Sequence, residues 1–162
     1  MSNPNPSPLS HAMPEAIRQL PAEAQQEVLA WVEKLLATQN EGVDELYNAI
    51  SSIVKFIPNF MVIPLMVEQI HPRIAAGVCV KMGVEKATGY ANDLPVEYLS
   101  SVTHHLPNPM VGEILTAMKR YAAEKLITYE IEHHRTDLQA LMPYVSESHQ
   151  ALITQAEKNA TH

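Results

Sequence analysis

The sequence predicts an all-α protein, and three observations support this fold class. Apolar residues recur at helical spacing, and prolines divide the chain into short segments. No run of five or more alternating β-branched and aromatic residues occurs that would form a half-buried strand. Only 5 of the 162 residues are glycine, so the turns of β-hairpins are scarce. Because 46% of the residues are hydrophobic and 18% are charged, the chain has enough apolar material for a core.

The N-terminal part of the chain is expected to consist of a tail and a separate helical segment. Residues 1–9 are mostly Pro, Asn and Ser, which favours a disordered tail. Residues 10–42 form the N-terminal helical segment, with a helix at 22–38 and Gly42 ending it. The apolar stripe of this helix contains Val28, Leu29, Val32, Leu35 and Leu36. Residues 43–162 are then expected to form a helical-repeat domain.

Prolines and charges predict where the helices of that domain begin. Asp44 and Glu45 place negative charge in the first turn of a helix at 44–57. Later helices are expected to open at the prolines that follow: Pro58, Pro72, Pro95, Pro107, Pro109 and Pro143. The segment 72–82 is apolar on nearly every side, which predicts a central helix enclosed by others. Gly77 within it indicates a close helix crossing.

An internal repeat is the most informative feature of the sequence. Residues 50–62 (ISSIVKFIPNFMV) and 99–111 (LSSVTHHLPNPMV) share six identical positions. Each copy predicts a helix that ends before a proline, followed by Asn59 or Asn108 as the cap of the next helix. A fainter similarity relates residues 85–90 (EKATGY) to 124–129 (EKLITY). Repeats of roughly 40 to 50 residues are typical of arrays of helical hairpins, so we expect a short superhelix.

Residues 68–106 (EQIHPRIAAGVCVKMGVEKATGYANDLPVEYLSSVTHHL) resemble a known family. The order of a helix end with His-Pro, a short apolar helix, an "EKA" helix and an "LP" helix start is similar to the N-terminal domain of MgtE-type magnesium transporters. It is also similar to the armadillo-like domain of the flagellar motor switch protein FliG. The resemblance implies a right-handed superhelix that acts as a scaffold or regulatory module. It further implies a partner-binding surface at Glu68, His71, Pro72 and Arg73.

Charge and composition argue against several classes of partner. Eleven basic and eighteen acidic residues give a net charge of -7 without a basic patch, so nucleic acid is not an expected partner. The most apolar stretch, residues 56–67, is shorter than the roughly 20 residues needed to span a membrane. The single cysteine, Cys79, excludes an internal disulfide, and the N-terminus lacks a signal-peptide pattern. A cytoplasmic, bacterial protein is the expectation.

Two Glu-x-x-His pairs offer an alternative based on metal chemistry. The pairs are Glu68 with His71 and Glu130 with His133. Di-iron helical bundles use this spacing because residues i and i+3 share one helix face. However, Pro72 biases His71 away from the helical conformation. Helical phase also predicts that His133 lies on the buried face of its helix and that His134 points to solvent.

The sequence favours a non-enzymatic module that binds another protein or another copy of itself, with no cofactor. It contains no Gly-x-Ser-x-Gly, no phosphate-binding loop and no His-Glu-x-x-His motif. One alternative is a small helical enzyme that binds a metal, in the manner of di-iron proteins, or a metabolite. Another is an accessory or antitoxin-like bacterial factor, because residues 17–37 resemble the LP-x-x-x-Q-x-x-V helix of small antitoxins.

Overall fold

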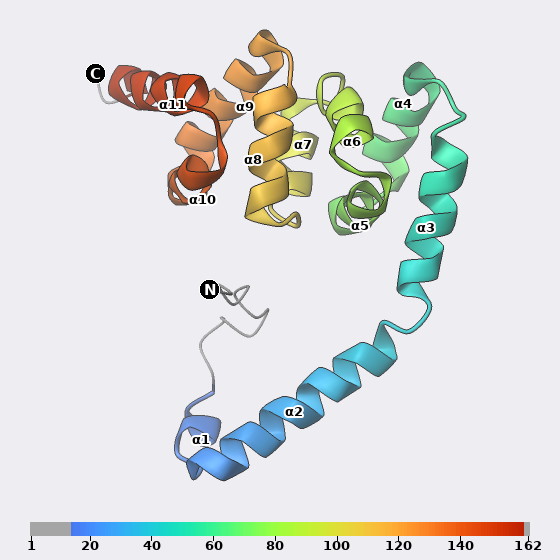
Figure 1. Ribbon diagram of the computed structural model, residues 1–162, viewed down its shortest axis with the longest axis vertical. Coiled ribbons are helices and arrows are strands. Elements are labelled where there is room, and N and C mark those ends of the chain that lie inside the picture. Colours follow the sequence, from blue (N-terminus) through green and yellow to red (C-terminus); the bar gives the residue numbers. More distant parts are fainter. Residues whose placement is uncertain (1–13, 161–162) are drawn as a thin grey trace. The chain divides into compact units, whose positions relative to one another are not determined.

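The computed structural model describes residues 14–160, and within them every regular element is helical (Figure 1). The all-α prediction is therefore confirmed for the described part of the chain. Two compact units divide the chain, one covering residues 1–43 and the other residues 44–162. The predicted tail at 1–9 lies outside the described residues.

The first unit contains α1 (Glu15–Arg18) and α2 (Ala22–Gln39), which confirms the helix predicted at 22–38. Gln25 fixes the turn between them, because its Nε2 donates to the carbonyl oxygens of Arg18 at 3.1 Å and Leu20 at 2.8 Å. Neither helix contains a buried residue. On the apolar side of α2, Val28, Leu29 and Val32 are half-buried, and the neighbouring Trp31 is 64% exposed.

The second unit is a succession of short helices that pack in two alternating series. Its elements are α3 (Val43–Val54), α4 (Asn59–Gln69), α5 (Pro72–Met82), α6 (Val84–Ala91), α7 (Val96–Thr103), α8 (Asn108–Ala117), α9 (Arg120–His133), α10 (Arg135–Leu141), the 3-10 helix η1 (Met142–Tyr144) and α11 (Glu147–Ala160). In one series α5 packs on α7, α7 on α9 and α9 on α11. In the other, α6 packs on α8 and α8 on α10.

Most of the prolines mark helix starts, as the sequence predicted. Pro58, Pro95 and Pro107 each occupy the position immediately before a helix, with φ between -56° and -61°. Pro72 is the first residue of α5. Pro143 lies in the first turn of the 3-10 helix η1 and does not open an α-helix.

The turns in the two similar segments are closed by equivalent backbone hydrogen bonds. The amide of Ile57 donates to the carbonyl of Val54 at 3.0 Å, and the equivalent bond from Leu106 to Thr103 is 3.1 Å. After each turn the proline carbonyl accepts the first bond of the next helix. Two details differ from prediction. Helix α3 ends at Val54 rather than at 57, because the chain tightens into a turn before Pro58.

The prediction that Asn59 and Asn108 cap the following helices was also wrong. Each is the first residue of its helix, and the preceding proline takes the cap position without a side-chain hydrogen bond. Proline can do this because its fixed φ already suits the start of a helix.

The core extends from α5 to α11. Its most buried large side chains are Leu115, Ile127, Leu138 and Ile153. Gly112 in α8 allows the backbone of Tyr144 to approach so closely that a Cβ atom at Gly112 would collide with it. Gly77 in α5 makes room for the ring of Tyr47 on α3, so a side chain makes the close approach at this glycine.

Helix α5 is enclosed on one side only, which corrects the expectation of a fully enclosed helix. Ala75, Ala76 and Cys79 are buried, whereas Ile74 is 41% exposed and Val80 is 46% exposed. Its all-round apolar sequence therefore serves two surfaces, the core on one side and an open apolar surface on the other.

Candidate functional site

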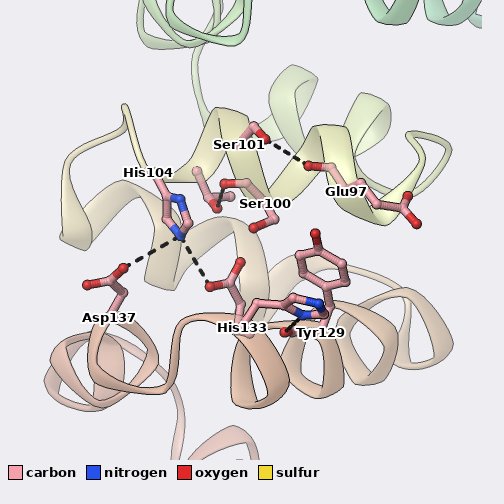
Figure 2. Close-up of polar contacts among 9 residues, drawn as sticks. Glu97, Ser100, Ser101, His104, Tyr129, His133 and Asp137 are labelled. Carbon is pink, nitrogen blue, oxygen red and sulfur yellow. Dashed lines mark hydrogen bonds and ion pairs between the residues drawn. The ribbon is translucent and has the colours of Figure 1, made fainter.

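Histidine and carboxylate side chains from three helices converge at one place in the second unit. The Nε2 atom of His104 lies 3.2 Å from Oε2 of Glu130 and 3.7 Å from Oδ2 of Asp137. The rings of His104 and His134 meet edge to face, with their centroids 4.4 Å apart. Ligand atoms of His104, His134 and Asp137 all lie within 4.8 Å of one another. We call these four residues the histidine–carboxylate cluster; Figure 2 shows His104 and Asp137 turned toward each other.

Local backbone structure positions each member of the cluster. His104 follows the last residue of α7. His134 separates α9 from α10 with φ -144° and ψ 43°, outside the helical region. Asp137 lies in the first turn of α10, where a negative charge is favoured by the helix dipole. The break at His134 is therefore what brings its ring and Asp137 to the end of α7.

Glu130 is the unusual member of the cluster. It lies on the core-facing side of α9 and is only 4% exposed. Its Oε2 contacts His104, but its Oε1 is buried without a hydrogen-bond partner. Because buried polar atoms are normally paired, this oxygen is free to accept a further partner, such as a hydrogen-bond donor or a cation.

A cavity of about 190 Å³ adjoins the cluster. His104, Glu130 and Asp137 form its polar end. Its apolar walls include Val111, Leu115, Leu126, Ile127, Leu138 and Leu141. The cluster is therefore reachable by a small ligand or an ion.

The expected orientations of His133 and His134 were reversed. His133 is exposed, with its Nδ1 2.9 Å from the carbonyl oxygen of Tyr129 and its ring stacked on the Tyr129 ring at 4.1 Å (Figure 2). His134 is half-buried and faces His104. The helical-phase argument failed for His134 because α9 ends at His133, so His134 does not continue its spiral.

The partner-binding residues expected from sequence lie at the corner between α4 and α5. Glu68, His71 and Arg73 are exposed, and Pro72 is half-buried. His71 also has a structural role, because its Nδ1 accepts a hydrogen bond from the backbone amide of Arg73 at 3.2 Å and so caps α5.

The alternative metal set of Glu68, His71, Glu130 and His133 occupies separate places. Glu130 meets His104, and His71 has its ring 6.2 Å from that of His105. Within residues 14–160, the close group of three metal-ligand side chains contains none of the four. One pattern in the sequence could have indicated the observed histidine–carboxylate cluster: His134 and Asp137 are spaced i, i+3 at the start of a helix.

An apolar groove of about 260 Å³ lies between α3, α4, α5 and α6. It is lined by Ile50, Val54, Ile57, Met61, Val62, Leu65, Met66, Ile70, Ile74, Ala75, Val78, Cys79, Met82 and Tyr90. Of the fifteen large apolar residues that are exposed in the described part of the chain, nine lie between positions 46 and 80. Three of these nine, Met61, Leu65 and Ile74, line the groove, so part of its apolar lining is open to solvent.

Three titratable groups on α5, on α7 and just after α7 have shifted pKa values. Burial raises the pKa of the Cys79 thiol to about 11. Burial, with a smaller contribution from Cys79, raises the pKa of Tyr98 to about 12. The pKa of His105 is lowered by desolvation and then by the positive charges of His71, Arg73 and His104. Cys79 is therefore a packing residue rather than a nucleophile.

Comparison with known proteins finds no matching family model, no matching curated protein and no matching solved structure. The described helices also contain none with the length and apolar composition needed to span a membrane.

Proposed function

We propose that this protein is a non-enzymatic helical-repeat module, a scaffold or regulator, that binds another protein by accepting an amphipathic helix in its apolar groove. The observation that carries the proposal is the groove itself, with its aliphatic and methionine walls and the exposed apolar residues around it. Amphipathic helices bind such grooves through apolar anchors at positions i, i+3 or i+4, and i+7. A bacterial cytoplasmic setting is part of the same proposal.

Methionines suit the groove to a helical ligand. Met61, Met66 and Met82 contribute flexible, polarizable side chains to its walls. Such side chains can repack around ligands of different shape, and this adaptability is characteristic of binding surfaces that accept several helices. The groove therefore favours a helix with large aliphatic or aromatic anchors.

The helices around the groove carry balanced charge. From residue 43 to residue 91 the chain contains four basic residues, Lys55, Arg73, Lys81 and Lys86, and four acidic residues, Asp44, Glu45, Glu68 and Glu85. Nζ of Lys81 also lies 3.4 Å from Oδ1 of Asp44. We therefore expect apolar contacts, and not charge, to select the partner helix.

The corner of Glu68, His71, Pro72 and Arg73 belongs to the same proposed surface. Ile70 and Ile74 line the groove. His71, Pro72 and Arg73 lie between them in the chain, and Glu68 lies two positions before Ile70. The resemblance of residues 68–106 to MgtE-type and FliG helical-repeat domains supports a scaffold role.

A photo-crosslinking amino acid at Leu65, which is 53% exposed and lines the groove, tests the proposal. The crosslinked helix is identified and its affinity is measured as a synthetic peptide. We expect Leu65→Glu to weaken binding more than about tenfold, since it introduces a charge into an apolar contact. Val80→Glu is the matched control, because Val80 is 46% exposed on α5 but does not line the groove. Equal loss in both variants, or crosslinks outside the groove, would contradict the proposal; crosslinks to the same chain would identify the partner as a second copy.

The contribution of the corner is tested separately with Glu68→Ala, His71→Asn and Arg73→Ala combined. Asparagine retains an acceptor at the cap of α5, so the fold should remain intact, whereas alanine there would cost about 1 kcal/mol. We expect weaker peptide binding with an unchanged thermal unfolding midpoint. Unchanged binding would remove the corner from the interface.

A further inference from the structure

We propose that His104, His134, Asp137 and Glu130 form a binding site for a divalent transition-metal ion of the zinc type. Two independent observations support it. The ligand atoms of His104, His134 and Asp137 converge within 4.8 Å. Beside them, the carboxylate of Glu130 is buried and has an unpartnered oxygen.

The distances from His104 to the two carboxylates suit a metal site that contracts slightly around an ion. In tetrahedral zinc sites with bonds of about 2.0–2.2 Å, neighbouring ligand atoms are about 3.3 Å apart. Nε2 of His104 already lies 3.2 Å from Oε2 of Glu130 and 3.7 Å from Oδ2 of Asp137. His134 belongs to the junction before α10, and Asp137 belongs to α10, which has only seven residues. Small side-chain movements can therefore close the remaining gaps.

The donor set selects the class of ion. Two imidazoles and two carboxylates suit Zn²⁺ and its neighbours Co²⁺, Ni²⁺ and Fe²⁺. Mg²⁺ and Ca²⁺ prefer all-oxygen ligands. The cluster contains no thiolate, which argues against Cu⁺.

An ion pair between protonated His104 and Glu130 explains less of the geometry. It accounts for one contact of Oε2 and leaves Oε1 of Glu130 buried without a partner. It also gives no reason for the ring of His134 to meet that of His104. A bound cation accounts for the convergence of His104, His134 and Asp137, with Glu130 in contact with His104 beside them. The adjoining cavity provides a path for its entry.

The test is calorimetric titration of Zn²⁺ into the tag-free full-length protein after removal of metals with a chelator. We expect one ion per chain and a higher thermal unfolding midpoint with Zn²⁺, because the ion binds the folded state. Co²⁺ should give the intense visible absorption of four-coordinate cobalt. Excess Mg²⁺ should not displace either ion.

Three variants and one control assign the site. His134→Ala, Asp137→Asn and Glu130→Gln should each weaken Zn²⁺ binding by at least about tenfold, since changes even to supporting groups have effects of this size. Asp137 has a 64% exposed side chain, so its variant should fold normally. His133→Ala is the matched control, because His133 contacts Tyr129 instead of the cluster.

Two results would overturn the proposal. One is the absence of stoichiometric Zn²⁺ binding by the folded protein. The other is binding that persists in Asp137→Asn and His134→Ala, or that falls equally in His133→Ala, which would indicate adventitious binding to surface histidines. Both results are independent of whether the apolar groove binds a helix.

Discussion

Glu130 occupies a position on α9 where an apolar side chain would fit the neighbours. It shares its face with Ala123, Leu126 and Ile127, all of which are buried. A carboxylate there lowers the stability of the folded protein unless its charge is neutralised. The residue therefore points to a role other than packing.

Replacing this carboxylate tests that conclusion at the residue scale. We expect Glu130→Met to raise the free energy of unfolding of the metal-free protein by about 1–3 kcal/mol, because it removes an unpaired buried oxygen at similar volume. The measurement is urea unfolding in the presence of chelator. A less stable variant would show that the contact with His104 outweighs the cost of burial.

Cys79 should be unreactive in the folded protein. Its pKa of about 11 leaves very little thiolate at pH 8, and the side chain is only 7% exposed. We expect slow labelling by a thiol reagent in buffer and rapid labelling of the one thiol in denaturant. Because the folded state keeps the proton longer than the unfolded state, stability should also fall as the pH rises above about 9. Rapid labelling of the native protein would contradict both expectations.

Part of the site could be read from the sequence and part could not. Glu130 was a candidate metal ligand, because a Glu-x-x-His pair is visible in one helix. Its partner His104 is 26 positions away on another helix, and only the packing of α7 on α9 brings them together. The position of the His134 ring depends on the break between α9 and α10, and no proline or glycine marks this break in the sequence.

At the scale of elements, local chemistry was the reliable guide. Prolines with a fixed φ predicted the starts of α4, α5, α7 and α8 from neighbouring residues alone. Element ends were less predictable. The tightening after Val54 and the passage from α10 into η1 depend on turns that many sequences can form.

Glycines in α8 and α6 provide a matched pair of element-scale variants. Alanine is intrinsically better than glycine inside a helix by about 1 kcal/mol. Gly112→Ala should nevertheless destabilise the protein by about 1–3 kcal/mol, because its Cβ would collide with the Tyr144 backbone. Gly89→Ala meets no atom within 4 Å and should stabilise it slightly. Chemical denaturation of both variants checks this, and equal effects would contradict the close approach of η1 to α8.

At the scale of the whole molecule, the two units should separate on proteolysis. Helices α1 and α2 contain no buried residues, and the hydrophobic core lies entirely in the second unit. We expect a protease specific for glutamate to cut at Glu41, which is exposed beside Gly42, and to leave a fragment starting at residue 42. Circular dichroism should show that this fragment unfolds at nearly the same temperature as the full chain. Loss of cooperative unfolding would show that the second unit depends on the first.

Burial along the second unit is uneven, and this has a consequence for its motion. Helix α3 has no buried residue and α4 has one, whereas α9 has six. Local opening requires least free energy where few side chains are anchored, so amide hydrogen exchange should be fastest near the groove and slowest around α9. Helices α3 and α4, which line the apolar groove, can therefore open locally and change shape around a ligand. Helix α9 is held by more buried side chains and keeps the histidine–carboxylate cluster in place.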